Sequence, residues 1–178
     1  MKNIVLIGMP AAGKSTIGVI LAKVLGLNFI DTDLLIQEQE KCLLKDIISN
    51  KGLDGFLEIE NQVNCDLFTT NSVISTGGSI VYSEPAMNHL REIGIVVYIE
   101  LSYETIRKRL GNIKQRGVVF REGQTLESLY KERCPLYEMY AHITIPSEGY
   151  GTEVLMEIIA EAVRQFENLE NNNENEWD

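Results

Sequence analysis

The sequence contains no long hydrophobic run. No apolar stretch approaches the roughly 20 residues that a membrane-spanning helix requires, so no membrane partner is expected. The first apolar run, residues 4–7, ends at Gly8 and is too short for the core of a signal peptide. These absences predict a cytoplasmic protein.

Cysteine and histidine are scarce as well. The three cysteines form no close pair, and the two histidines do not complete a Cys/His ligand set with them. We therefore expect reduced thiols that pack as small apolar side chains. The residues concerned are Cys42, Cys65, Cys134, His89 and His142.

Positive charge is low for the size of the chain. The 178 residues include 16 Lys+Arg against 26 Asp+Glu, which gives a formal net charge of −10. The field of such a chain repels a long polyanion, so nucleic acid is a poor candidate partner. With 44% hydrophobic and 24% charged residues, the composition is that of one soluble globular domain, and the chain is long enough to bury a core.

The charge is also unevenly distributed. No basic residue follows Arg164, while five acidic residues do, so residues 168–178 are predicted to form a solvated, disordered tail. In contrast, the segment from Arg107 to Arg133 holds eight of the sixteen cations. This concentration indicates either a local anion site or a solvated basic helix face, and charge alone does not separate the two.

Short apolar runs alternate with segments of helical periodicity. The alternation predicts a parallel α/β sheet covered by helices on both faces, in a single domain of residues 1–167. Strands are expected at 3–7, 28–30, 73–75, 93–100 and 143–145. Helices are expected at 17–25, 34–68 with breaks at Gly52 and Gly55, 103–110, 126–137 up to a break near Pro135, and 152–166.

One segment carries a phosphate-binding motif. The stretch GMPAAGKS at 8–15 satisfies G-x-x-x-x-G-K-[ST] in full and lies between a predicted strand and a predicted helix. Backbone N–H groups of such a loop surround phosphate oxygens at a helix N-terminus, Lys14 reaches the β- and γ-phosphates, and Ser15 ligates Mg²⁺. The motif predicts binding of a nucleoside triphosphate with Mg²⁺ by Gly8, Ala11, Ala12, Gly13, Lys14, Ser15 and Thr16.

Two aspartates leave the end of the second predicted strand, at the edge where open α/β sheets bind ligands. Asp31 and Asp33 can face the same way, so one can hold the Mg²⁺ shell while the other orients or deprotonates an acceptor hydroxyl. The alternative is that Asp33 merely caps the following helix. Gly77 and Gly78 follow the third strand, where they either let backbone approach a ligand closely or form a tight turn.

Together these features resemble the shikimate kinase family over nearly the whole chain, from Lys2 to about Phe166. The resemblance implies a P-loop NTPase fold, a three-layer α/β/α structure with five parallel strands in the order 2-3-1-4-5. It also implies a lid at about 111–123 and a substrate-binding helical segment at about 33–60. The matching pieces are GMPAAGKST at 8–16, DTD at 31–33, the phenylalanine and acid of FLEIE at 56–60, TGG at 76–78, Arg116, and ERCPLY at 132–137.

The resemblance implies roles for individual residues. Asp33 would bind the acceptor and act as its base, Asp31 would assist Mg²⁺ together with Ser15, and Arg116 would act from the lid. Arg133 would pair with the shikimate carboxylate and Arg109 would pack against adenine. The implied catalytic residues are Lys14, Asp33 and Arg116, and the implied substrate-binding residues are Asp33, Leu57, Glu60, Gly77, Gly78, Ser79 and Arg133.

Three positions depart from the family pattern. Leu57 replaces the arginine of F-R-x-x-E, which in the family is a principal ligand of the shikimate carboxylate, and an apolar side chain cannot supply that bidentate contact. Ser79 occupies the position of the third glycine of the family motif. Its hydroxyl group is expected to narrow the pocket floor and make it more polar. Gly117 stands for the proline after the lid arginine and loosens the lid.

Three functions are compatible with the sequence. The first is a monomeric small-molecule kinase that uses ATP and Mg²⁺, with shikimate as the acceptor that the resemblance implies. The second is a related kinase whose acceptor is homoserine, another hydroxy amino acid or a polyol, because Leu57 leaves the pocket more negative beside Asp33, Glu58 and Glu60. The third is a nucleotide-binding switch without an acceptor. In such a switch Asp33, Gly78 and Arg133 would have no ligand to bind, which argues against it.

Overall fold

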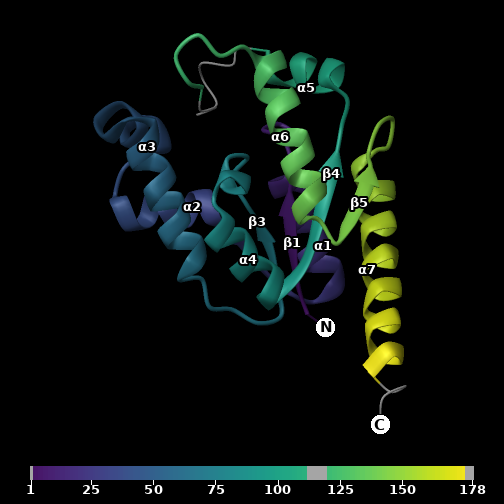
Figure 1. Cartoon of the computed structure of the whole chain (residues 1–178). Coiled ribbons are helices and arrows are strands. Elements are labelled where there is room, and N and C mark those ends of the chain that lie inside the picture. The colour runs from purple at the N-terminus through teal and green to yellow at the C-terminus, as the bar shows by residue number, and fades with distance from the viewer. Residues whose placement is uncertain (1, 112–119, 175–178) are drawn as a thin grey trace.

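The computed structural model describes residues 2–111 and 120–174 of the chain. Five parallel strands form one sheet in the order β2-β3-β1-β4-β5 (Figure 1). This order confirms the predicted α/β fold, and each strand lies within one residue of its expected bounds. The strands are β1 (Asn3–Ile7), β2 (Asn28–Asp31), β3 (Ser72–Ser75), β4 (Gly94–Glu100) and β5 (Ile143–Pro146).

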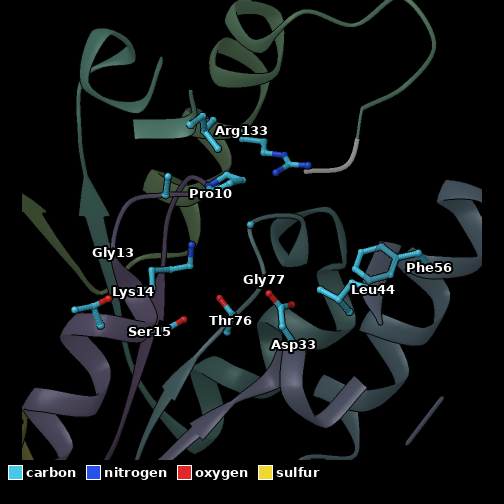
Figure 2. A pocket seen from close by; sticks show the side chains of 14 residues that line it. Pro10, Gly13, Lys14, Ser15, Asp33, Leu44, Phe56, Thr76, Gly77 and Arg133 are labelled. Atoms are coloured by element: carbon cyan, nitrogen blue, oxygen red, sulfur yellow. The ribbon is translucent and has the colours of Figure 1, made fainter. Parts of the chain in front are cut away.

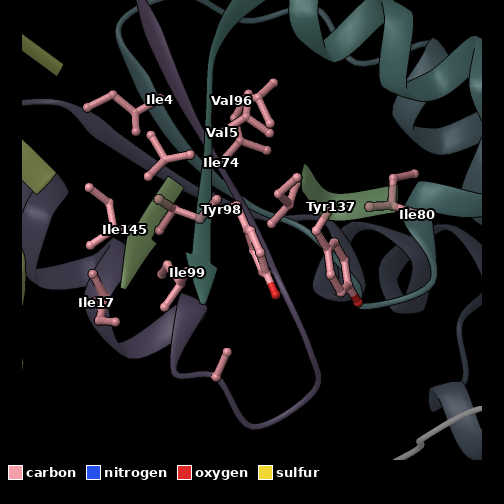
Figure 3. Close-up of a cluster of buried hydrophobic side chains, with 14 of the residues drawn as sticks. Ile4, Val5, Ile17, Ile74, Ile80, Val96, Tyr98, Ile99, Tyr137 and Ile145 are labelled. Carbon is pink, nitrogen blue, oxygen red and sulfur yellow. The ribbon is translucent and has the colours of Figure 1, made fainter. Parts of the chain in front are cut away.

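The central strand is the most apolar segment of the chain. All five residues of β1 are buried, because strands pair on both of its edges and helices cover both of its faces. Its partners keep register, with Val5 opposite Ile74 of β3 and Val96 of β4. Figure 3 shows these side chains in the core, with Tyr98 of β4 beside Tyr137 from a covering helix.

Seven helices and one 3₁₀ helix are found among the described residues. Helices α1 and α7 pack against each other on one face of the sheet, while α4 and α6 pack against β4 on the other face (Figure 1). The elements are α1 (Lys14–Leu25), α2 (Thr32–Glu40), α3 (Leu44–Cys65), η1 (Ile80–Tyr82), α4 (Glu84–Ile93), α5 (Tyr103–Leu110), α6 (Leu126–Tyr140) and α7 (Thr152–Glu174).

The helices differ from the sequence predictions in several places, and the segment expected to be helical over 34–68 is divided into α2 and α3 at residues 41–43. Helix α4 was not predicted, although Ser83 caps it through its side chain and Pro85 follows in the first turn. Helix α6 continues through Pro135 to Tyr140, so the predicted break is wrong, because buried side chains on both sides of the proline fix the helix to the core. The predicted break at Gly52 is confirmed by its φ of 72°, whereas Gly55 lies inside helix α3.

The C-terminal segment also differs from its prediction. Helix α7 runs to Glu174, so the predicted disorder is wrong for residues 168–174. The acidic face of the helix has a partner at the other end of the chain. The backbone nitrogen of Lys2 donates to Glu167 Oε1 at 2.7 Å, and its Nζ lies 2.9 Å from Glu170 Oε2. Within the described ranges, no helix has the length and apolar character needed to cross a membrane.

Candidate active site

The phosphate-binding loop joins β1 to α1. Gly13 is the N-cap of α1 in a left-handed conformation (φ 99°) and no side chain caps the helix, so the first N–H groups of α1 face the loop. Lys14 is 8% exposed, and its Nζ donates to the carbonyl oxygens of Gly8 at 2.8 Å and Met9 at 3.1 Å. Burial lowers the pKa of Lys14 to about 8, although the carboxylate of Asp33 favours the charged form.

Ser15 and Asp31 meet at the base of this loop. Ser15 Oγ donates to Asp31 Oδ2 at 2.7 Å and lies 3.2 Å from Ser75 Oγ. The other carboxylate oxygen, Asp31 Oδ1, accepts the backbone N–H of Asp33 at 3.0 Å and caps helix α2. The proposed capping role of Asp33 is therefore wrong, because Asp31 is the cap. Hydroxyl and carboxylate oxygens are the ligand types that Mg²⁺ prefers, so this pair fits a magnesium ion whose other ligands are phosphate oxygens and water.

Asp33 enters the pocket from the first turn of α2. An added Cβ at Gly77 would overlap Glu60 Oε1 and lie 2.9 Å from Asp33 Oδ1, so both carboxylates converge on this glycine. Burial, and after it the nearby Asp31, raises the pKa of Asp33 to about 6, while Lys14 opposes both effects. A carboxylate with such a pKa is ionised at neutral pH and accepts a proton more readily than an exposed one.

Arg133 is fixed at the upper wall of the pocket. Its side chain belongs to α6, is 1% exposed, and donates from Nε to Tyr82 Oη at 3.2 Å while its guanidinium lies 5.1 Å from the centre of the same ring. A Cβ at Gly78 would approach Arg133 Nη1 to 3.1 Å and Pro10 Cδ to 2.8 Å, so only glycine fits between the loop and the arginine. Tyr137 holds this backbone by donating to the Gly78 carbonyl oxygen at 2.6 Å.

These side chains surround one pocket of about 240 Å³. Figure 2 shows Lys14 and Ser15 on one side, Asp33, Leu44 and Phe56 on the opposite side, and Arg133 above them. The pocket therefore offers an ammonium group and a carboxylate on facing walls, with a guanidinium above them. Nine residues from the predicted set line it: Ala11, Gly13, Lys14, Ser15, Thr16, Asp33, Gly77, Gly78 and Arg133.

A second cavity, of about 220 Å³, lies on the other side of the phosphate-binding loop. Arg109 lines it from the end of α5, with its Nη1 3.3 Å from the Ala12 carbonyl oxygen and 3.4 Å from that of Ala11. Tyr150 and Leu155 supply apolar surface. The cavity shares Gly13 and Thr16 with the first pocket, so the loop runs between two neighbouring spaces.

Comparison with known proteins assigns the family. The family model described as shikimate kinase matches residues 10–164. Shikimate kinase of Haemophilus influenzae (strain PittEE) is 35% identical over 172 residues, which cover 94% of this chain and 96% of that protein. The chain belongs to the shikimate kinase family. Shikimate kinase of Pasteurella multocida (strain Pm70) is 37% identical over 166 residues, covering 91% and 95% of the two chains.

Solved shikimate kinase structures share the fold. The enzyme of Acinetobacter baumannii in complex with shikimate superposes with a TM-score of 0.86 at 32% identity, covering 93% of this chain and 94% of that one. Shikimate kinase of Aquifex aeolicus gives a TM-score of 0.80 at 31% identity, covering 91% and 96%. The similarity therefore extends over the whole shikimate kinase domain and is not restricted to the phosphate-binding motif.

Three of the predicted substrate-binding residues do not line the main pocket. Leu57, Glu60 and Ser79 line a neighbouring cavity of about 440 Å³ between α3 and η1. Leu57, the predicted departure from the family pattern, therefore lines a space beside this pocket. Arg116 and Gly117 of the predicted lid lie outside the described residues.

Several pocket residues were missed by sequence reasoning. Pro10 occupies a variable position of the motif, while Leu44 and Leu110 look like ordinary apolar helix residues. Tyr82, which holds Arg133, is 51 residues away from it in the chain. No local pattern marks these positions, because only the folded sheet brings their elements together.

Proposed function

We propose that this chain transfers the γ-phosphoryl group of ATP to a hydroxyl group of shikimate. Membership of the family makes it an ATP-dependent small-molecule kinase. The observation that carries the proposal is the single pocket in which the phosphate-binding Lys14 faces the Asp33 carboxylate beside Arg133. A relative with a TM-score of 0.86 was solved with shikimate bound, which supports this acceptor.

On the nucleotide side, the loop N–H groups and Lys14 would bind the phosphates. Lys14 now donates to two loop carbonyls, and a phosphate oxygen would be a stronger, charge-assisted acceptor for the same Nζ. Ser15 and Asp31 would hold Mg²⁺, which would neutralise charge on the β- and γ-phosphates. Arg109 and the cavity that it lines would receive the adenine.

On the acceptor side, Asp33 would bind the reacting hydroxyl and take its proton. Its pKa of about 6 leaves it ionised at neutral pH. Arg133 would bind the acceptor carboxylate, because its guanidinium is already oriented by Tyr82 and loses little freedom on binding. Arg116 would stabilise the transferred group from the lid.

The acceptor is tested by measuring ADP release in a coupled assay across shikimate, homoserine, other hydroxy amino acids and polyols. We expect shikimate to be used with a kcat/KM of about 10⁴ M⁻¹s⁻¹ or higher, within the normal enzyme range, and homoserine far less well. A hydroxy amino acid used more efficiently than shikimate would contradict the proposal. ADP release at the same rate without any acceptor would instead indicate a nucleotide switch.

Two further features stay predictions. The chain is expected to act as a monomer, and light scattering of the eluting peak in size-exclusion chromatography checks this. It is also expected to act in the cytoplasm.

A further inference from the structure

Tyr82 lies at the centre of a polar network beside the main pocket. It belongs to η1, and the described lining of that pocket includes its partner Arg133 but not Tyr82 itself (Figure 2). The Tyr82 Oη accepts a hydrogen bond from Arg133 Nε at 3.2 Å, and the Arg133 guanidinium lies 5.1 Å from the centre of the ring. One tyrosine therefore holds the arginine by both its hydroxyl group and its ring.

The hydroxyl group of Tyr82 has a second partner. Burial raises the pKa of Tyr82, Arg133 opposes this effect, and a side-chain hydrogen bond to Glu132 adds to it. The side chain is therefore a neutral phenol at pH 7, which can accept from Arg133 while it donates to the Glu132 carboxylate. Because Glu132 and Arg133 are consecutive residues of α6, the two hydrogen bonds join this part of the helix to η1.

A turn outside the main pocket belongs to the same network. The backbone N–H of Gln124 donates to the Arg121 carbonyl oxygen at 3.0 Å, and Gln124 Oε1 accepts the Arg121 N–H at 3.1 Å. Gln124 Nε2 donates to Glu132 Oε2 at 2.9 Å. The Arg121 guanidinium lies 5.8 Å from the centre of the Tyr82 ring. These contacts form a closed circuit, so the turn 121–124 and Tyr82 hold each other in place.

The network acts on the arginine that is proposed to bind the acceptor carboxylate. Arg133 is 1% exposed, and its long side chain would lose rotamer freedom on binding if it were not already ordered. With Nε held by Tyr82, Nη1 lies beside Gly78, which lines the main pocket. The guanidinium is thus oriented at the pocket before the acceptor binds, which favours binding.

We propose that Tyr82 is a positioning residue for acceptor binding, and that the turn 121–124 supports acceptor binding through the Tyr82 ring. Tyr82 acts by holding Arg133, and Arg121 and Gln124 act by holding Tyr82. The inference rests on the proposed function, in which Arg133 binds the acceptor carboxylate. It extends the determinants of acceptor affinity to residues outside the described lining of the main pocket.

The hydroxyl group is tested by Tyr82→Phe, which keeps the ring and removes the acceptor of the Arg133 hydrogen bond. The KM for shikimate, and its Kd measured by isothermal calorimetry without ATP, should rise about tenfold, as expected for loss of a hydrogen bond to a charged group. The KM for ATP should stay unchanged. A merely structural role would lower the melting temperature and the active fraction and leave both KM values at the wild-type level.

The turn is tested by Arg121→Ala. The same two shikimate constants should rise about threefold, because a cation–π contact at an exposed position is weaker than a charged hydrogen bond. Arg121→Lys should recover part of the loss, since an ammonium group can also lie over the ring. Arg107→Ala is the matched control: it removes a guanidinium that lies 5.9 Å from the ring of Tyr103, on the exposed face of α5, and should change neither constant. An equal rise in Arg121→Ala and Arg107→Ala would overturn the proposal.

A double-mutant cycle tests whether the turn acts through Tyr82. Tyr82→Leu removes the ring, so the addition of Arg121→Ala to it should weaken shikimate binding no further. Additive effects of the two substitutions would show that Arg121 acts independently of Tyr82 and would overturn the proposal. Tyr82→Phe and Arg121→Ala each remove a single contact, so they give an answer even if Tyr82→Leu does not fold.

The orientation of Arg133 is also measured without any acceptor. A buried, hydrogen-bonded Nε–H should give a slowly exchanging ¹⁵N–¹H signal, identified by its loss in Arg133→Lys. The signal should shift or disappear in Tyr82→Phe and persist in Arg107→Ala. If the wild type neither binds nor phosphorylates shikimate, the proposed function fails, while this signal still decides whether Tyr82 holds Arg133. An unchanged Nε–H signal in Tyr82→Phe, or wild-type shikimate constants in that variant, would overturn the proposal.

Discussion

At the scale of single residues, the two aspartates at the end of β2 and the start of α2 have different contacts. Asp31 uses both carboxylate oxygens, one on Ser15 and one on the N–H of Asp33. The side chain of Asp33 is thereby left to face Gly77 and the pocket. Two identical side chains spaced by two thus acquire different environments, and burial raises the pKa of Asp33 to about 6.

The residue whose loss should be most severe is Lys14. Lys14→Ala removes the buried cation of the loop, which no neighbouring residue of the loop replaces, so kcat should fall by about 10²–10³ or more. Steady-state kinetics with saturating ATP measure this. Because burial already disfavours the charged form of Lys14, the substitution should not lower the melting temperature. A variant that keeps more than about a tenth of the wild-type rate would contradict a catalytic role for the loop.

The loop motif, the spacing of the two aspartates and the resemblance to a known family were sufficient to find the central residues of the pocket. Lys14, Asp33 and Arg133 were all predicted, and they line one pocket. Tyr82 was not found, because its contact with Arg133 depends on the packing of η1 against α6. Leu57 was recognised as a departure, but the sequence could not indicate that it faces a separate cavity.

At the scale of elements, the arginines of the basic segment 107–133 fall into two groups. Arg109 and Arg133 reach the loop and the pocket, whereas Arg107 pairs with Glu104 on the exposed face of α5. The two alternatives drawn from charge alone, an anion site and a solvated helix face, are therefore both represented in the one segment.

The end of α5 offers a prediction with a matched control. Arg109→Ala removes the guanidinium beside the Ala12 carbonyl and opens the cavity assigned to adenine, so the KM for ATP should rise about 5- to 10-fold while kcat changes little. Lys108→Ala, on the exposed neighbouring position, should leave both constants unchanged. Equal effects of the two substitutions would show that general charge, and not the position of Arg109, supports ATP binding.

The lid gives a second prediction at this scale. Arg116→Ala should lower kcat far more than it weakens ATP binding, because a lid arginine meets the phosphoryl group mainly in the closed state. Pre-steady-state measurement of ATP affinity beside kcat separates the two effects. An unchanged kcat with only a raised KM for ATP would assign Arg116 to ground-state binding.

The sheet was predictable and the helices less so, for physical reasons. Each strand is a short apolar run between glycine or polar residues, and parallel strands that are buried on both faces leave that pattern in any context. The end of α6 depends on tertiary contacts, because Arg133 and Tyr137 anchor the helix across Pro135. The polar end of α7 is likewise held by Lys2, which is 165 residues from its partner Glu167.

At the scale of the whole molecule, the buried ionisable side chains in and around the pocket lower the free energy of unfolding. Burial raises the pKa of Glu60 to about 7 and that of Asp33 to about 6, and it lowers the pKa of Lys14 to about 8. The folded chain binds more protons than the unfolded chain at the two acids, so their ionisation destabilises the fold as pH rises from about 4 to 7. The lysine acts in the opposite direction, and its cost is relieved as pH rises from about 8 to 10.5.

The free-energy cost of holding the ionised carboxylate of Glu60 in the fold can be measured directly. Glu60→Gln mimics the neutral acid, so it should raise the free energy of unfolding at pH 8 by up to about 3 kcal/mol, following 1.36 kcal/mol per pKa unit. At pH 4 the side chain of Glu60 is largely neutral in both the folded and the unfolded chain, so the two proteins should unfold nearly alike. Urea denaturation of both proteins at the two pH values gives the comparison. A loss of stability at pH 8 would mean that the ionised Glu60 is held by attraction to Arg133 and Lys14.

The contact of Lys2 with α7 determines where the two ends of the chain lie. Lys2 and the last turns of α7 lie at the amino edge of the sheet, whereas the pocket lies at the carboxyl edge (Figure 1). An affinity tag or a carrier protein joined to either terminus is therefore directed away from the ligands. A chain tethered to a sensor surface by either end presents its pocket to the solution, so surface-based binding measurements can use both orientations of attachment.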